Sequence, residues 1–220
     1  MRTGLRYSAI CFIVALAGCG DERAANESNF GAALSKALGQ DVCLGYSLTR
    51  LLDQFITRED AVVRRFDVLV RAGLLKNDQI EEVPQITGGV VKMWTYSLTT
   101  KGETFYQEKD IAENMFEPAK TVKRGDFCYG KLALGSVLKW EGPRRNGDYA
   151  EATVTYTYKI ADAADWSAAP EIRAAFPRVG EIADSSGKLE TQDVVRLTNL
   201  GWEAGPLSIV EGMRAAGAVK

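Results

Sequence analysis

The sequence predicts an α+β fold, in which N-terminal helices and a β-hairpin precede an antiparallel sheet with short helices. Three observations support this class. Apolar residues recur at helical spacing in residues 30–38 and 62–70, a Gly-Gly pair stands at 88–89 in a predicted hairpin, and residues 151–160 alternate between apolar and polar side chains. Helical and strand periods in separate stretches favour α+β over alternating βαβ units.

Three helices are expected before the hairpin. Residues 30–38 carry one apolar stripe, and residues 48–56 carry a second. A third stripe follows Thr57, which forms the arrangement of a capping box with Asp60, three residues later. Gly73 marks the expected end of this third helix, because glycine commonly terminates helices.

The predicted hairpin spans residues 79–99 and turns at the Gly-Gly pair, which suits a tight turn. Residues 101–116, KGETFYQEKDIAENMF, are expected to close the first half as another helix. On composition we place the boundary between two modules, 30–117 and 118–220, at Glu117-Pro118.

The second module is predicted to form around the strand EATVTYTYKI at 151–160, with one face in the core and the other in water. Residues 131–141 supply an expected partner strand, and 142–148 supply the turn between the two strands. One or two short helices broken at Pro170 and a further strand at 188–198 follow.

The first residues of the chain have the layout of a secretory signal. Arg2 and Arg6 precede an uncharged run of 14 residues that ends at Asp21. A membrane-spanning helix needs about 20 apolar residues, so this run is too short to cross a bilayer. The pattern therefore predicts export rather than a transmembrane anchor.

Within this run, Leu16-Ala17-Gly18-Cys19 resembles a bacterial lipobox. The resemblance implies that residues 1–18 are a cleaved signal peptide and that Cys19 receives a diacylglycerol and an acylated amino terminus. Residues 19–29 would then be a lipidated tether on a protein of the cell envelope that faces the periplasm. Gly20, in place of an aspartate, favours the outer membrane over the inner one.

Two cysteines remain without a role. Cys11 lies in the expected signal and Cys19 is the expected lipid site, which leaves Cys43 and Cys128. Because export leads to an oxidising compartment, we expect these two to form a disulfide. The alternative is a pair of buried free thiols.

Two short motifs occur twice in the same order. DVCLG at 41–45 returns as DFCYG at 126–130, and LTTKG at 98–102 returns as LTNLG at 197–201. One interpretation is an internal duplication. The other is coincidence, because five-residue matches arise by chance.

Residues 46–106 resemble a winged-helix segment, with helices, a hairpin and YSLTTKG. In that family the third helix enters the major groove of DNA, and here it would offer Arg58, Arg64, Arg65 and Arg71. However, residues 30–117 hold 10 basic and 13 acidic side chains, whereas phosphate binding needs a basic face. We therefore predict no nucleic-acid partner and interpret these arginines as a solvated helix face.

The composition also excludes several classes of catalytic site. The chain of 220 residues has no histidine, which excludes Ser-His-Asp and Cys-His catalysis and most catalytic zinc sites. Removal of residues 1–18 leaves 202 residues and takes the net charge from −2 to −4, because Arg2 and Arg6 are lost. No spacing for a cofactor or a metal appears, so none is predicted.

Three sets of side chains are candidates for a site. Asp162 and Asp165 could form a catalytic carboxylate pair, although aspartates at this place more often cap a helix. Arg144 and Arg145 are the candidate partner contact, either with an anionic group or with lipid head groups, and the alternative is simple solvation. Three aromatic residues could line a ligand cleft or pack in the core; they are Trp140, Tyr156 and Tyr158.

These observations predict a membrane-anchored envelope lipoprotein that acts as a non-catalytic binding or interaction module. Its partners would be the membrane, through the lipid, and another envelope protein. Two alternatives stay open. One is an exported inhibitor or immunity-type protein, which should present an acidic or aromatic patch of about 800 Å². The other is a histidine-free hydrolase that uses carboxylates in a concave pocket.

Overall fold

The computed structural model describes residues 21–48, 51–55, 61–84, 88–113, 120–147 and 149–219. The helices are α1 (Glu27–Leu38), α2 (Ala61–Arg71), α3 (Thr100–Phe105), the 3-10 helix η1 (Asp165–Ala168), α4 (Pro170–Ala175), α5 (Pro177–Ser185) and α6 (Ser208–Ala215). The strands are β1 (Asp41–Cys43), β2 (Leu51–Phe55), β3 (Leu75–Pro84), β4 (Val90–Leu98), β5 (Tyr106–Glu113), β6 (Lys120–Asn146), β7 (Tyr149–Ala161), β8 (Glu190–Thr198) and β9 (Gly201–Ala204). The predicted α+β class is confirmed.

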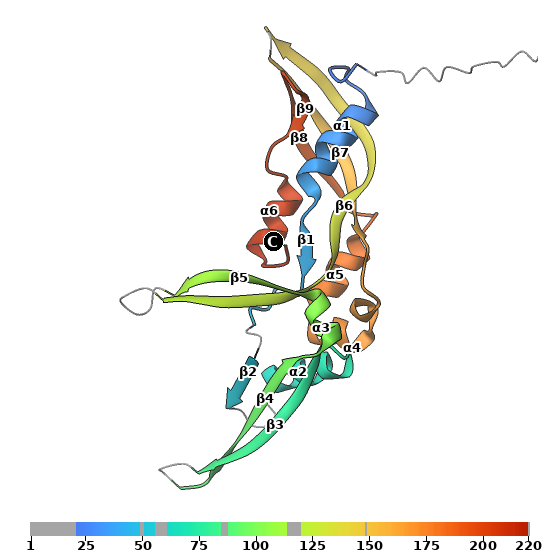
Figure 1. Ribbon diagram of the computed structural model, residues 1–220. Helices are drawn as coiled ribbons and strands as arrows, with labels where there is room; N and C mark the ends of the chain where they lie inside the picture. Colours follow the sequence, from blue (N-terminus) through green and yellow to red (C-terminus); the bar gives the residue numbers. More distant parts are fainter. Residues whose placement is uncertain are drawn as a thin grey trace, which may run out of the picture.

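Strand β6 pairs with β1, β5 and β7 in a six-stranded antiparallel sheet (Figure 1). The order along the sheet is β1-β6-β7-β8-β9, and β5 pairs with the first part of β6. Three register shifts interrupt the pairing of β6 with β7, and such bulges bend and twist a strand. Strand β6 pairs with β5 over residues 120–127 and with β7 over residues 131–146, so one long strand joins both partners.

Helices α1 and α6 cover one face of the large sheet. The ring of Phe30 on α1 meets the rings of Trp140 and Trp202 edge-on, at centroid distances of 5.5 and 4.8 Å. Val154 and Val195 from the central strands are fully buried. This side of the sheet therefore holds the core of the upper part of the molecule in Figure 1.

The opposite face of β7 is less exposed to solvent than the alternation predicts. Thr155 and Thr157 are only 3% and 5% exposed. Strand β7 is central, so side chains from β6 and β8 flank both threonines: Ser136 lies 3.2 Å from Thr157, and Gln192 donates to Thr155 at 3.2 Å. The expected wet face is wrong at these two positions, because the neighbouring strands cover them.

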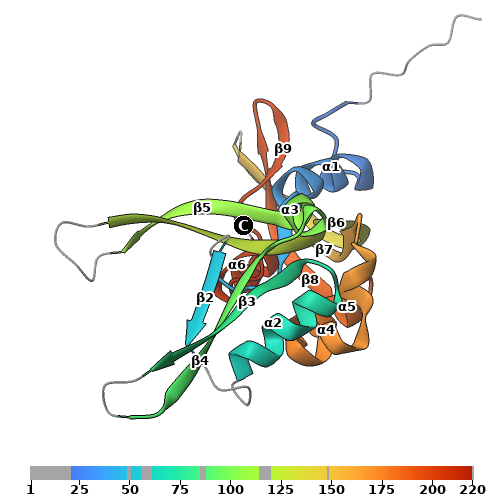
Figure 2. The same cartoon turned by 60° about the horizontal axis from the view of Figure 1, so that its bottom comes forward.

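A second sheet has three strands in the order β2-β4-β3, and α2 lies beside it (Figure 2). The helix expected over residues 48–56 is wrong, because Leu51–Phe55 form β2 and pair with β4. An isolated helix of about nine residues is marginal, so pairing with a neighbouring strand overrides the periodicity. The winged-helix resemblance is thus limited to α2 and the β3–β4 hairpin, and Thr57 and Asp60 lie outside the described residues.

The helix expected over residues 101–116 is also shorter than predicted. Helix α3 ends at Phe105, and β5 begins at once and pairs with β6. Thr99 caps α3, since its Oγ1 accepts a hydrogen bond from the Gly102 amide at 2.9 Å. A methyl group at Gly102 would lie 2.0 Å from the Leu74 carbonyl oxygen, so only glycine lets α3 sit against the start of β3.

Two further boundaries differ from the sequence analysis. Strand β6 runs to Asn146, so Arg144 and Arg145 are paired strand residues and not part of a loop over 142–148. The expected tether over residues 19–29 is corrected at its end, because α1 begins at Glu27 and Asn26 caps it. The hairpin, the strand β7, the helix break at Pro170 and the strand β8 are confirmed.

The two predicted modules share one sheet. Strand β1, from residues 30–117, pairs with β6, from residues 118–220, and α1 packs on β6 and β9. The boundary at Glu117-Pro118 and the signal segment lie outside the described residues. Among the described residues, no helix is long and apolar enough to cross a membrane.

Candidate binding groove

A disulfide fixes the junction of the two modules. Cys43 on β1 and Cys128 on β6 are paired in register and bonded, across a sequence separation of 85 residues. Both are buried, with 1% and 6% exposed. The expected disulfide is therefore present, and the alternative of two free thiols is wrong.

A buried carboxylate beside this disulfide holds the loop that follows β1. Asp126 is 4% exposed, and its Oδ2 accepts hydrogen bonds from the backbone amides of Gly45 and Tyr46 at 2.7 and 3.0 Å. Its Oδ1 accepts from the Phe127 amide at 2.8 Å. The motif Asp-x-Cys in residues 126–128 thus supplies one cysteine of the disulfide and the carboxylate that binds the backbone amide of Tyr46.

A groove lies between α2 and α4, which Figure 2 shows side by side. Its volume is about 620 Å³. The lining residues are Ala61, Arg64, Arg65, Asp67, Val68, Arg71, Glu171, Ala174 and Ala175. Small alanines on α4 leave the space open, and arginines on α2 line it.

A second groove of about 330 Å³ adjoins the first, because Arg65 and Ala175 line both. Tyr46, Phe176 and Arg178 belong to its wall. We call the two together the arginine groove. It runs from α2 past α4 to the start of α5 and the loop after β1.

The walls of the arginine groove are ordered by aromatic contacts. The guanidinium carbon of Arg65 lies 5.5 Å from the centre of the Tyr46 ring, a cation–π arrangement. The Tyr46 ring in turn meets the rings of Phe66 and Phe176 edge-on, each at 6.1 Å. Arg178 donates a hydrogen bond to the carbonyl oxygen of Ala216. These contacts hold Arg65 and Arg178 in place.

The charge of the groove is mixed, with an excess of cations. Four arginines (Arg64, Arg65, Arg71 and Arg178) face three carboxylates (Asp67, Glu171 and Glu181). Guanidinium groups bind carboxylates and phosphates in a bidentate manner, and Val68 and the alanines offer apolar contact. The groove suits an extended ligand that carries both negative charge and apolar groups.

Sequence reasoning placed three of these arginines on a solvated helix face. Arg64 and Arg71 are exposed, but they stand beside a second helix that the one-dimensional pattern does not reveal. Their spacing of seven residues puts both on one side of α2, and this spacing is the sequence feature that could have indicated a shared site. Arg58 lies outside the described residues.

The candidate carboxylate pair lies away from the grooves. Asp162 and Asp165 are both exposed, and neither lines any of the grooves described here. Asp165 lies in the first turn of η1, where a negative charge is favoured by the helix dipole. The expected capping role is wrong for η1, because Ala164 occupies the N-cap position and no side chain makes a capping hydrogen bond there.

Two of the candidate cleft aromatics are core residues. The Tyr156 hydroxyl donates to Asp193 at 2.7 Å, and the Tyr158 hydroxyl donates to the Ile182 carbonyl at 3.0 Å. Burial, followed by the contact with Asp193, raises the pKa of Tyr156 above its ordinary value. Burial also raises the pKa of Tyr158, which contributes to a shallow groove between α5 and α6. Trp140 is 38% exposed and packs on Phe30.

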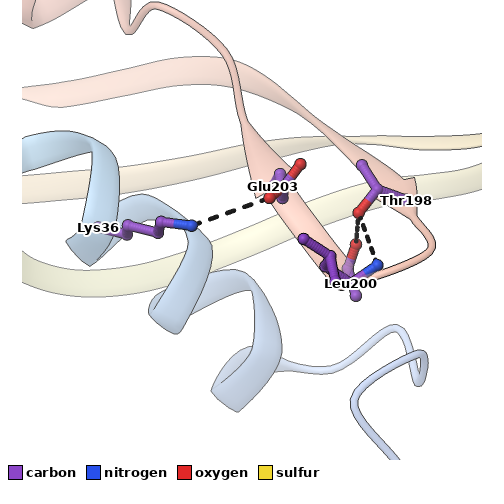
Figure 3. Close-up of polar contacts among 5 residues, drawn as sticks. Lys36, Thr198, Leu200 and Glu203 are labelled. Atoms are coloured by element: carbon purple, nitrogen blue, oxygen red, sulfur yellow. Dashed lines mark hydrogen bonds and ion pairs between the residues drawn. The ribbon is translucent and has the colours of Figure 1, made fainter.

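Another groove, of about 460 Å³, lies between α1 and β9. Lys36 on α1 and Glu203 on β9 form an ion pair at 3.8 Å along it (Figure 3). Leu200, in the β8–β9 turn, lines this groove and is 73% exposed. No sequence pattern marks this leucine, since its exposure depends on the geometry of the turn.

The remaining predicted residues are placed as follows. Arg144 and Arg145 are exposed near the end of β6, and Arg144 is paired with Glu151 on β7. Cys19 lies outside the described residues.

Within the described ranges, no group of three or more His, Cys, Asp or Glu side chains could hold a metal ion. No family model, curated protein or solved structure matches the chain.

Proposed function

We propose that the protein is a lipid-anchored protein of the bacterial cell envelope that acts by binding another envelope component through the arginine groove. The observation that supports this best is the groove itself, with arginines from α2 and α5 around an apolar floor. The groove carries no catalytic constellation among the residues described. Binding, rather than chemistry, is therefore the role that its geometry favours.

The partner we propose is an acidic segment of another envelope protein. An extended peptide that carries carboxylates and apolar side chains would match the guanidinium groups and the surface formed by Val68, Ala174 and Ala175. Arg65 is held over Tyr46, so part of the ordering cost of binding is met before the partner arrives.

The anchor in this proposal is Cys19, in the lipobox-like stretch Leu16-Ala17-Gly18-Cys19. Two or more acyl chains on one residue hold a protein on a membrane far more firmly than one chain. The mature protein would face the periplasm, on the outer membrane in preference to the inner one.

The test is a comparison of two charge reversals. Arg64→Glu with Arg71→Glu changes exposed arginines of the groove, and Arg144→Glu with Arg145→Glu makes the same change of charge at the β6–β7 hairpin. We expect a partner captured from solubilised envelopes by the parent protein to be lost with the groove variant alone. The purified partner should then bind the parent protein directly, and salt should weaken that binding.

Melting curves establish that both variants fold. Loss of the partner with the hairpin variant alone would move the site to Arg144 and Arg145 and overturn the groove proposal. Equal capture by all three proteins would contradict both sites.

A further inference from the structure

The start of the described chain is fastened to the β8–β9 hairpin. The Trp202 indole N–H donates to the carbonyl oxygens of Arg23 and Ala24 at 3.2 and 3.1 Å. The Arg23 guanidinium donates to the carbonyl oxygen of Thr198 at 3.3 Å. At Gly201 a methyl group would come within 3.2 Å of the Glu22 carbonyl oxygen. Residues 22–24 are therefore docked on the sheet rather than free.

This docking limits the reach of a lipid on Cys19. An extended chain spans at most about 3.6 Å per residue, so the Cα atoms of Cys19 and Asp21 are at most about 7 Å apart. Whatever surface holds the lipid must then lie close to the β8–β9 turn. A freely moving tether of eleven residues, over 19–29, would by contrast impose no orientation.

The β8–β9 turn presents one large apolar side chain at this place. Leu200 is 73% exposed, the largest value among the exposed apolar residues that the structure describes. The Thr198 hydroxyl accepts from the Leu200 amide at 3.0 Å and donates to the Gly201 carbonyl at 3.0 Å (Figure 3). The turn is thus fixed by its own hydrogen bonds, and it holds Leu200 outward.

The turn of the β6–β7 hairpin lies at the same end of the strands as the β8–β9 turn. Arg145 is paired with Ala150, and Ala150 is paired with Leu197, one residue before Thr198. Two strand spacings of about 4.8 Å therefore separate Arg145 from β8. Figure 1 shows both hairpin ends and the first described residues, before α1, at one end of the molecule, with the β3–β4 hairpin at the other.

We propose that this end of the molecule rests on the bilayer, with Leu200 inserted among the acyl chains and Arg144 and Arg145 beside the phosphate groups of the lipids. The inference rests on the proposed lipid anchor at Cys19. In this orientation α2 and α4 lie toward the end of the molecule away from the membrane (Figure 1), so the arginine groove is open to a periplasmic partner. One apolar side chain adds little affinity by itself, so its effect is on orientation rather than on attachment.

The experiment places an environment-sensitive fluorophore on single introduced cysteines of the lipidated protein. Leu200→Cys reports on the β8–β9 turn, and Val90→Cys, at a position 58% exposed in the β3–β4 hairpin, is the matched control. Cys43 and Cys128 do not compete for the label, because they are bonded to each other. The proteins are reconstituted into vesicles of phosphatidylethanolamine and phosphatidylglycerol.

We expect the label at position 200 to show blue-shifted emission and to be quenched several-fold more than the label at position 90 by lipids with spin-labelled acyl chains. A protein that floats with the vesicles but gives equal, water-like signals at both positions would overturn the orientation and leave the anchor intact. A parent protein that fails to float, like its Cys19→Ser variant, would overturn the anchor and the orientation together.

Discussion

The two sheets differ in what stabilises them. The large sheet holds the disulfide, the 27-residue strand β6 and the cluster of Phe30, Trp140 and Trp202. The small sheet has three strands and depends on α2 and on Phe66, whose ring meets those of Tyr96 and Tyr46 at 5.1 and 6.1 Å. We call the large sheet the support, because it carries the disulfide and the aromatic cluster, and we call the small sheet with α2 the proposed binding region, because α2 lines the arginine groove.

The strongest test of this comparison removes the disulfide. In the chain-entropy model a bridge that closes a loop of 85 residues stabilises the folded state by about 4–5 kcal/mol. We expect Cys43→Ser with Cys128→Ser to lower the free energy of unfolding by up to that amount, as measured by urea denaturation. Reduction of the parent protein should lower its melting temperature in the same direction. A double variant as stable as the parent would show that β6 and the aromatic cluster hold the support without the bridge.

Two matched core truncations would separate the sheets. Phe30 and Phe66 are both almost fully buried, with 0% and 1% exposed, so each change to alanine should cost about 3–5 kcal/mol. With Phe30→Ala we expect faster hydrogen exchange throughout the molecule, because the support itself is weakened.

With Phe66→Ala the exchange should accelerate chiefly in α2, β3 and β4, and much less in β7 and β8. Identical exchange patterns in the two variants would show that the sheets unfold as one unit. The difference between support and binding region would then have no energetic basis.

The same division separates what the sequence could reveal from what it could not. Strand β7 was predictable because its alternation and its β-branched and aromatic residues agree. The disulfide could be predicted by counting cysteines in a chain that was expected to be exported. Both features lie in the large sheet, and each could be inferred from neighbouring residues or from a count of residues.

The small sheet and the groove depend on contacts between distant residues. Leu51–Phe55 have a helical pattern but pair with β4, about forty residues later, and Tyr106–Glu113 pair with β6 rather than extend α3. Arg65 meets Tyr46, and Ala174 faces α2 across the groove, only after the chain has folded. A pattern read along one element cannot report such pairs, so the binding region was the less predictable part.

Within the large sheet, the smallest expected effect concerns a tyrosine whose hydroxyl has no hydrogen-bond partner among the described residues. Tyr129 is 2% exposed, and its ring lies 6.0 Å from that of Trp166. Because an unpaired buried hydroxyl is costly, Tyr129→Phe should leave the free energy of unfolding at neutral pH unchanged or raise it by up to about 1 kcal/mol. Tyr158→Phe is the control, and it should lower that free energy by about 1 kcal/mol because the bond to Ile182 is lost.

Alkaline pH should enlarge the difference between Tyr129→Phe and the parent protein. Burial, more than any neighbouring charge, raises the pKa of Tyr129 above its ordinary value of 10.0, so the unfolded chain loses this proton at a lower pH than the folded one. Ionisation of this group therefore leaves the free energy of unfolding unchanged below about pH 10, and lowers it as pH rises from there toward the folded-state pKa. Urea denaturation at neutral and alkaline pH should therefore show a shallower decline for Tyr129→Phe than for the parent protein. Parallel declines would mean that this hydroxyl reaches water, and that the support is less tightly packed at Tyr129 than its burial indicates.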